Sequence, residues 1–486
     1  MKTLRLFFVL MTLAFNQSCV YGQDDTNDKI KQVESNLIST IQFKDETPKT
    51  LEERMAYYKV HGLSLAVIQN YHILWAKGYG TADESLKIPV TPQTLFQAAS
   101  ISKSINAVGV LKLVQEKKID LYADINTYLK SWKFPYDSLA KGKKISMANL
   151  LSHTGGLTVH GFPGYEQGKP LPSVVQILNG QKPANSDPIR SMYEPGLRSE
   201  YSGGGITISQ MVVMDVTHQP YADYMKKNVL QPLGMTSSTY AQPPVGVTPS
   251  LLSAGYDSNG KTIPGKYHIY PEQAAAGLWT NPTDLAKYII ETQLAYEGKS
   301  AKVLDQQTTK LRLTPFQNAD AALGVFITTT NVDSTKYFQH GGANEGFRCQ
   351  YYGSLKDGNG IVVMVNSDNG EILQEVVNSV AKVYNFKGLL LNTVKTLVKV
   401  SDSDLESYTG QYALKPDFII TLSRDGNQLY AQATGQPKFP IYPEAQNKFF
   451  PKNFLADLEV IKDATGKVTS VILYQNGHKN EAKKIK

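Results

Sequence analysis

A serine and a lysine three residues apart, Ser100 and Lys103, are the side chains with the clearest chemical potential in this sequence. A serine hydroxyl is a weak nucleophile until a neighbouring base takes its proton, and a lysine amine can be that base. On a helix, residues three apart lie on the same face, so the two side chains become neighbours. The spacing therefore predicts the nucleophile and the base of an acyl-transfer site.

The same Ser-x-x-Lys spacing occurs elsewhere in the chain, at Ser138/Lys141, Ser258/Lys261 and Ser379/Lys382. Ser138 and Ser258 stand in polar, turn-rich segments, which predict solvated loops. Ser379 lies in the middle of a helical pattern, where its N–H is already bonded and cannot help to stabilise an anion. These three pairs are therefore poor candidates for the site.

Ser100 alone is followed by apolar residues at helical spacing, namely Ile101, Ile105, Val108 and Leu111. This pattern predicts an amphipathic helix of about four turns that Ser100 opens. The free N–H groups of a helix start stabilise developing negative charge. The alternative interpretation is an ordinary capping serine beside a solvated lysine.

The N-terminus is typical of a secretory signal peptide. Lys2 and Arg5 precede an apolar run over residues 6–15, which is shorter than the about 20 residues that span a bilayer. Small residues favour cleavage after Gly22, so residues 1–22 are the predicted signal peptide and the predicted localisation is periplasmic or secreted.

Two cysteines bear on this prediction. Cys19 is a possible lipid-bearing residue, but Asn16 and Gln17 match the apolar lipoprotein pattern poorly, so we favour cleavage over anchoring. Removal of the leader leaves Cys349 alone, and no intramolecular disulfide can then form.

Composition limits the function classes. With 486 residues and 41% hydrophobic composition, the chain is long enough for two domains. The net charge of +7 comes from scattered lysines rather than a basic stripe, so we expect no nucleic-acid partner. No later apolar segment is long enough to be an integral membrane span. There is no His-Glu-x-x-His motif and no Cys/His cluster, so neither a metal nor another cofactor is expected.

The patterning along the chain indicates an α+β domain followed by an all-β domain. We predict a strand hairpin over residues 61–68 and 72–76. Helices are predicted at residues 206–216 and 285–296, and an apolar strand at residues 361–365. From about residue 398 the pattern changes to short strands separated by turns.

Two further motifs, Tyr201-Ser202-Gly203 and His340-Gly341-Gly342, complete a pattern with Ser100 and Lys103. Together they resemble the serine β-lactamase and penicillin-binding-protein superfamily, and most of all its class C β-lactamase-like serine hydrolases, the S12 peptidase group. The resemblance covers roughly residues 51–384. Supporting landmarks in the expected order are the stretches 150–157, 194–196, 232–235 and 276–279.

The resemblance implies a role for each motif. Ser100 would form an acyl-enzyme, and Lys103 and Tyr201 would share the base role, the first proton acceptor staying undecided. The N–H groups of Ser100 and Ala343 would form the oxyanion hole. The implied substrate-binding residues are Ser202, Gly203, His340, Gly341 and Gly342.

Two positions depart from relatives. His340 stands where the family often has the lysine of Lys-Thr-Gly, and it either orients a substrate carboxylate, tunes Tyr201 or is simply a neutral histidine at a strand end. Gly203 replaces the usual asparagine, which puts β-lactamase activity in doubt. The run Gly203-Gly204-Gly205 either opens room for another acyl group or is a flexible loop. Ser152-His153 is interpreted as structural.

The predicted organisation is a polar segment (23–50), an α+β β-lactamase/transpeptidase-like hydrolase domain with an antiparallel sheet (51–390), a linker (391–400) and a small lipocalin-like β domain (401–486). The expected function is hydrolysis of a small ester or amide, as by an esterase or D-peptidase, with a small-molecule or short-peptide substrate. The alternatives are a class C-type β-lactamase or penicillin-binding protein, an inactive peptidoglycan- or ligand-binding protein, and a structural envelope protein.

Overall fold

The computed structural model describes residues 25–317, 321–452, 454–475 and 477–486. The predicted signal peptide and Cys19 lie outside the described residues. The chain divides into two compact units, which we call the sheet unit and the barrel unit. The sheet unit comprises the described residues up to Ile30, Glu52–Leu373 and Tyr384–Leu389, and the barrel unit comprises Lys31–Leu51, Gln374–Val383 and Leu390–Lys486.

The sheet unit contains a seven-stranded antiparallel sheet in the order β4-β3-β2-β10-β9-β8-β7. Its strands are β2 (Gly62–Gln69), β3 (His72–Asp83), β4 (Ile88–Pro89), β7 (Phe326–Thr329), β8 (Lys336–Asn344), β9 (Phe347–Ser354) and β10 (Gly360–Val365). The predicted hairpin is the β2–β3 pair, with Asn70 and Tyr71 at its turn. A separate short pair joins β5 (Phe96–Gln97) to β6 (Trp279–Thr280).

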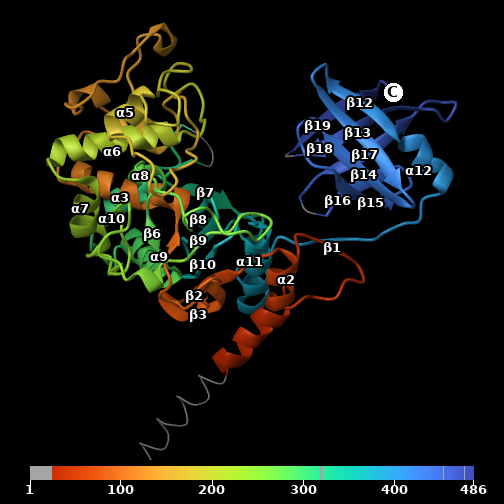
Figure 1. Cartoon of the computed structure of the whole chain (residues 1–486), viewed down its shortest axis with the longest axis horizontal. Helices are drawn as coiled ribbons and strands as arrows, with labels where there is room; N and C mark the ends of the chain where they lie inside the picture. The colour runs from red at the N-terminus through yellow and green to blue at the C-terminus, as the bar shows by residue number, and fades with distance from the viewer. Residues whose placement is uncertain (1–24, 318–320, 453, 476) are drawn as a thin grey trace, which may run out of the picture. The chain divides into compact units, whose positions relative to one another are not determined.

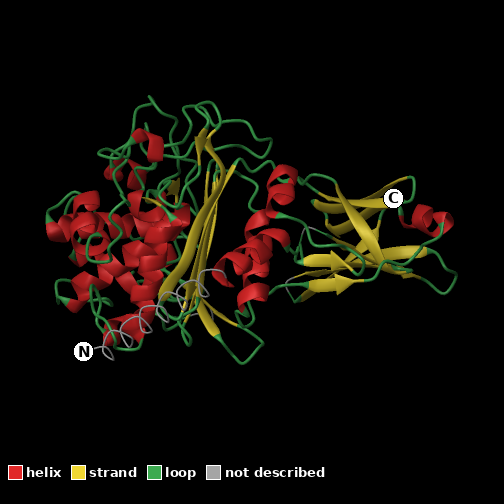
Figure 2. Ribbon diagram, turned by 90° about the horizontal axis from the view of Figure 1, so that it is seen from below, coloured by secondary structure: helices red, strands yellow, loops and turns green. Residues whose placement is uncertain are grey.

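Helices make up much of the rest of this unit, and Figure 2 shows many of them stacked on one face of the sheet. The α-helices are α2 (Leu51–Tyr57), α3 (Ser102–Gln115), α4 (Met147–Leu151), α5 (Val174–Asn179), α6 (Gly203–Thr217), α7 (Tyr221–Met225), α8 (Gln273–Ala276), α9 (Pro282–Tyr296) and α10 (Gln306–Arg312). Shorter helical turns are η1 (Ala99–Ile101), η2 (Ile125–Thr127), η3 (Ser138–Ala140), η4 (Lys226–Leu230) and η5 (Pro249–Leu251). Helix α11 (Glu371–Tyr384) contributes to both units.

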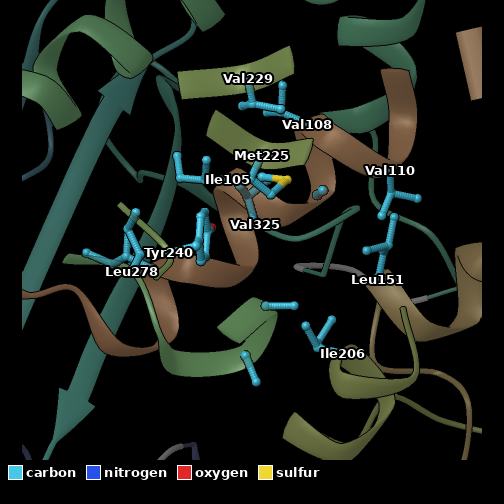
Figure 3. Packing of buried hydrophobic residues seen from close by; sticks show 14 of the residues in the cluster. Ile105, Val108, Val110, Leu151, Ile206, Met225, Val229, Tyr240, Leu278 and Val325 are labelled. Carbon is cyan, nitrogen blue, oxygen red and sulfur yellow. The ribbon is translucent and has the colours of Figure 1, made fainter. Parts of the chain in front are cut away.

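Helix α3 differs from its prediction, because it is not amphipathic. Every residue from Ser102 to Leu111 is buried, so the helix runs through the core rather than along its surface. Figure 3 shows Ile105 and Val108 of α3 packed with Met225 and Val229 from other elements. The polar face of α3 is buried because it meets polar partners from the surrounding elements.

Those partners satisfy the polar groups of α3 one by one. Asn106 donates to the Ser209 hydroxyl over 3.0 Å and accepts from the Tyr221 hydroxyl over 2.9 Å. The Tyr351 hydroxyl donates to Ser104 over 3.0 Å. Buried polar groups bonded in this way avoid the cost of desolvation without a partner. A single sequence does not reveal these long-range pairs, so the apolar spacing alone suggested a surface helix.

The other Ser-x-x-Lys pairs lie in different surroundings. Ser258 lies in a turn closed by a hydrogen bond from Gly260 N to Asp257 O, as predicted. Ser379 is buried in α11 and donates to the Val33 carbonyl. Ser138 is exposed to solvent, as predicted, but it begins the short helix η3, which the Asp137 carboxylate caps, rather than lying in a loop.

The barrel unit is built around a closed antiparallel barrel of eight strands, β12 to β19, as expected for a lipocalin-like domain. The strands are β12 (Gly410–Lys415), β13 (Phe418–Asp425), β14 (Gln428–Ala433), β15 (Phe439–Ala445), β16 (Lys448–Pro451), β17 (Asp457–Lys462), β18 (Val468–Gln475) and β19 (His478–Lys484). Helix α12 (Asp402–Tyr408) precedes the barrel, and β1 (Ile41–Phe43) pairs in parallel with β11 (Thr393–Lys395). Figure 1 shows the barrel in blue.

The described residues contain neither a membrane-spanning helix nor a metal-binding cluster. No helix in this part of the chain is long and apolar enough to cross a membrane. The same residues hold no group of three or more His, Cys, Asp or Glu side chains arranged to bind a metal ion.

Candidate active site

Ser100 lies in a tight turn between strand β5 and helix α3. The N–H of Ala98 donates to the Leu278 carbonyl over 2.8 Å, which ties the turn to the segment before β6. Ala99 has a φ of 48°, a left-handed conformation that is strained for a residue other than glycine. The Ser102 hydroxyl donates to the Ala99 carbonyl over 2.5 Å. Ser100 is only partly buried while its neighbours are fully buried, so this turn presents its side chain.

The local structure refines the predicted helix start. Ser100 is in the 3-10 turn η1, and the α-helix begins two residues later at Ser102. No side chain caps η1, so Ser100 is not an ordinary capping serine. The hydroxyl of Ser100 is instead directed to Lys103.

Lys103 joins the nucleophile to the surrounding elements. Its Nζ donates to Ser100 Oγ over 3.0 Å and to the Ala275 carbonyl over 2.7 Å. The same Nζ lies 4.9 Å from the ring centroid of Tyr201. The side chain is 98% buried, and among the residues described no carboxylate lies within 4.0 Å of Nζ. Lys103 is thus held by neutral oxygens alone.

Tyr201 is packed within a group of aromatic rings. Its ring centroid lies 4.3 Å from that of His153, 6.2 Å from that of His340 and 6.5 Å from that of Phe326. Ser100, Lys103, Tyr201 and His340 are therefore brought together, as the predicted site requires. His153 and Phe326 are additions that the sequence did not point to as site residues.

His153 shows what sequence reasoning overlooked. Ser152 is structural as predicted, because its hydroxyl donates to the Ala148 carbonyl over 2.7 Å. His153, however, contacts the Tyr201 ring and accepts a hydrogen bond from Ser202 N over 3.2 Å. The sequence does not show which of the two side chains faces the site, whereas the fold places His153 against Tyr201.

The two histidines at the site are neutral. Burial, reinforced by the charge of Lys103, holds the pKa of His153 well below its usual range and lowers the pKa of His340 to about 3. His340 Nδ1 lies 2.6 Å from the Gly341 carbonyl, so Nδ1 carries the proton. Its Nε2 is then a buried acceptor, unpartnered in the described part of the chain. A neutral imidazole gives a substrate carboxylate no charge partner, which argues against that predicted role.

The glycines of strand β8 allow close approach of the nucleophile turn. A Cβ at Gly342 would lie 2.3 Å from the Ala98 carbonyl oxygen and 2.4 Å from Cys349 Sγ. Cys349 is a free, buried thiol that donates to the same carbonyl over 3.1 Å. Strand β8 therefore packs directly on the turn that carries Ser100, and Ala343 follows at the next, exposed position.

The glycines at the start of α6 have a different role from either prediction. Gly203, Gly204 and Gly205 are buried in the helix, so they are not a flexible loop. A Cβ at Gly203 would lie 3.1 Å from both the His160 carbonyl oxygen and the Phe162 ring. The space beside these glycines is filled, and both predictions for the triplet were wrong.

Ser202 is occupied with capping this helix. Its hydroxyl accepts from Gly205 N over 2.9 Å and donates to the Thr158 carbonyl over 3.0 Å. The residue is 3% exposed. The structure thus places Ser202 next to Tyr201, with its hydroxyl engaged by the protein itself.

Comparison with known proteins agrees with this geometry. The sequence profile of the β-lactamase family matches residues 48–381. The chain belongs to the β-lactamase family. Its members are serine hydrolases, and this chain is one of them. A second profile, a domain of unknown function (DUF3471), matches residues 395–484, which include the barrel.

Curated relatives of this β-lactamase family member are distant. Protein flp of Staphylococcus aureus (strain N315) is 25% identical over 351 residues, which cover 70% of this chain and 66% of that protein. The match therefore spans slightly less than two thirds of the relative's length.

Solved structures share its fold. The octameric penicillin-binding protein homologue from Pyrococcus abyssi has a TM-score of 0.62 at 20% identity, covering 89% of this chain and 98% of that one. The D-amino acid amidase from Ochrobactrum anthropi SV3, in complex with L-phenylalanine, has a TM-score of 0.57 at 20% identity and covers 74% and 99%. At this level of identity the likeness concerns the fold alone.

Proposed function

We propose that this protein is a secreted or periplasmic hydrolase that cleaves a small ester or amide through an acyl-enzyme on Ser100. The observation that carries the proposal is the 3.0 Å hydrogen bond between Lys103 Nζ and Ser100 Oγ, at a lysine that no carboxylate neutralises within the described residues. A lysine amine within hydrogen-bond distance of the serine hydroxyl is placed to accept its proton.

The proposed reaction has two halves. In the first, Ser100 Oγ attacks the substrate carbonyl while its proton passes to the Lys103 and Tyr201 pair, and the pair then protonates the leaving group. The backbone N–H groups of Ser100 and Ala343 are the proposed donors to the oxyanion. In the second half, a water molecule attacks the ester carbon and gives a proton to the Lys103 and Tyr201 pair. The bond to Ser100 Oγ then breaks, the pair returns a proton to Oγ, and the acyl group leaves as a carboxylic acid.

The proposed substrate is neutral near the scissile bond. β-Lactams carry a carboxylate, and the neutral His340 offers it no charge. Gly203 also lacks the carboxamide of relatives, and Phe162 lies where a side chain at that position would begin. These observations favour an ester or an uncharged amide, such as a D-amino acid amide, over a β-lactam or a peptide with a free carboxylate beside the scissile bond. They keep His340 as a candidate for tuning Tyr201.

The test is intact-mass spectrometry with a fluorophosphonate, a β-lactam and a panel of short esters and D-amino acid amides. We expect a covalent adduct on the wild type and on Ser258→Ala, a control at another Ser-x-x-Lys site. We expect none on Ser100→Ala, whose circular dichroism should match the wild type. Absence of any adduct would instead support the ligand-binding alternative, and fast β-lactam turnover would contradict the proposed substrate class.

A further inference from the structure

The barrel has an apolar cavity at one end that the proposed reaction does not use. Its volume is about 100 Å³. Ile420, Ala431 and Leu458 form its buried floor, and the rings of Phe418, Phe439 and Phe454 surround its mouth. Apolar cavities of this kind stay dry and take apolar ligands.

The cavity itself is small, and its size follows from the side chains around it. Its volume of about 100 Å³ is below the roughly 150 Å³ of an apolar cavity that holds benzene, so it suits the end of an alkyl chain better than a ring system. Small residues leave this space open: Ala431 and Ala433 on β14, and Ala456 before β17, line it where larger side chains would fill it. The cavity is therefore built into the barrel by its sequence.

The opposite end of the barrel is covered by helix α12. Leu405 and Tyr408 of this helix pack into the barrel core, and the Tyr408 hydroxyl donates to the Gln446 carbonyl over 3.1 Å. Arg424 Nη1 donates to the Asp402 carbonyl over 2.7 Å and ties the start of the helix to β13. With that end covered, a ligand enters through the mouth with the three phenylalanines.

A second, more polar cleft of about 400 Å³ adjoins this mouth. The two cavities share Ala456 and Gln475 as lining residues. Lys395 in the cleft is neutralised by two carboxylates, but the Lys479 ammonium, 5.8 Å from the Tyr474 ring centroid, has no carboxylate within 4.0 Å among the described residues. Within the part of the chain that the structure describes, Lys479 is thus a cation without a carboxylate partner in a cleft beside the apolar cavity.

We propose that the barrel unit binds a single-chain fatty carboxylate. The end of the alkyl chain occupies the cavity, and the carboxylate lies in the adjoining cleft near Lys479. Burial of methylene groups supplies the affinity, and the lysine selects the anionic head group. This site is independent of the chemistry proposed for Ser100, because the residues that form it all belong to the barrel unit.

Titration calorimetry of the full chain with decanoate, below its micelle concentration, tests the proposal. We expect saturable binding to the wild type and binding at least about tenfold weaker to Ala433→Phe, which fills the mouth and excludes several methylenes. Gln432→Phe is the matched control, because it adds the same ring at the neighbouring exposed position and should bind as the wild type does. Ala456→Leu, in a loop, is a second blocking variant should Ala433→Phe misfold.

The head group is tested with decanol and decyltrimethylammonium, which have the same chain. We expect decanoate to bind most tightly and the cation least tightly, and Lys479→Gln to weaken decanoate binding by about threefold to tenfold while leaving decanol unchanged. Absence of saturable decanoate binding, or equal binding by the blocking variants and the wild type, would overturn the proposal. Equal affinity for all three head groups would overturn the role of Lys479.

Discussion

Two lysines, the buried Lys103 in the sheet unit and the half-buried Lys395 in the barrel unit, have opposite surroundings. Lys103 in the sheet unit is held by the Ser100 hydroxyl and the Ala275 carbonyl, which are both uncharged. Lys395 in the barrel unit donates to the carboxylates of Glu444 and Asp457 over 2.8 and 3.1 Å. Burial acts to lower the pKa of Lys395, but the hydrogen bonds to these carboxylates outweigh it and raise the pKa.

The two sets of partners give the two lysines different roles. Lys395 links elements of the barrel unit, whereas Lys103 lies beside the proposed nucleophile. Two carboxylates fix the charge of Lys395, so it acts as a link between β11 and the barrel strands. Lys103 has no carboxylate partner among the described residues, and neutral oxygens supply its hydrogen bonds instead. The site therefore lacks the stabilising ion pairs that surround Lys395 in the barrel unit.

The largest expected effect comes from removing each amine in turn. Lys103→Met should lower esterase activity about 10³-fold or more, because the proton of Ser100 loses its acceptor, while leaving thermal stability nearly unchanged. Lys395→Met should keep activity and cost about 1–2 kcal/mol of stability, because two carboxylates lose their partner. Rates of ester hydrolysis and thermal unfolding curves of both variants measure the two effects. A lower activity in Lys395→Met than in Lys103→Met would contradict the roles assigned to the two lysines.

Two glycines, one in each unit, differ in how closely the rest of the protein packs against their main chain. Gly342→Ala should abolish activity and destabilise the protein, because its Cβ would lie 2.3 Å from the Ala98 carbonyl oxygen. Gly426→Ala, in a barrel hairpin, meets no atom within 4 Å and has only the strain of its φ of 55°, about 1 kcal/mol. Activity and unfolding curves of the pair distinguish packing at the site from local strain. Similar losses in both variants would contradict the close approach of β8.

The sheet unit also contains a buried carboxyl group without a cationic partner among the described residues. Glu272 is fully buried just before α8, and no cation pairs with it in the described part of the chain. Burial raises its pKa from 4.5 to about 7, an effect that its own backbone N–H and Tyr165 only partly offset. The folded state therefore binds the proton more tightly, so stability is full below pH 4.5 and falls as the pH rises to about 7.

Glu272→Gln should remove this pH dependence and make the protein more stable than the wild type above pH 7, by up to about 3 kcal/mol. Denaturant unfolding between pH 4 and 8 measures the difference. Glu444→Gln is the control in the barrel unit, where it removes one partner of Lys395 and should bring no such gain. If the free energy of unfolding varied with pH in the same way for the wild type and Glu272→Gln, the raised pKa of the buried Glu272 would be ruled out.

The smallest effects concern two helix caps. Ser202→Ala removes a buried cap of α6 and should cost about 1–2 kcal/mol, whereas Ser401→Ala removes an exposed cap of α12 and should cost less than about 1 kcal/mol. Neither should change kcat/KM more than a few fold. A loss of about 100-fold in folded Ser202→Ala would show that this hydroxyl contacts the substrate.

The local sequence pattern was sufficient to predict several strands and the reactive side chains. The strand-like runs at residues 61–68 and 72–76 predicted the β2–β3 hairpin, and the run of short strands after residue 398 predicted the β-rich tail that closes into the barrel. Ser100, Lys103 and Tyr201 were found because their motifs are short and contiguous. These features depend on neighbours in sequence, which the chain itself displays.

Tertiary structure decided what surrounds those residues. Lys103 lacks an anion, His153 packs on Tyr201, and Phe162 fills the space beside Gly203, each through contacts between segments far apart in the chain. Burial of α3 on all faces likewise depends on partners such as Tyr221 and Tyr351. By itself the sequence determined the elements and the reactive side chains. Only packing decided which groups surround these side chains and how much space is left for a substrate, because burial and long-range contacts have no local pattern.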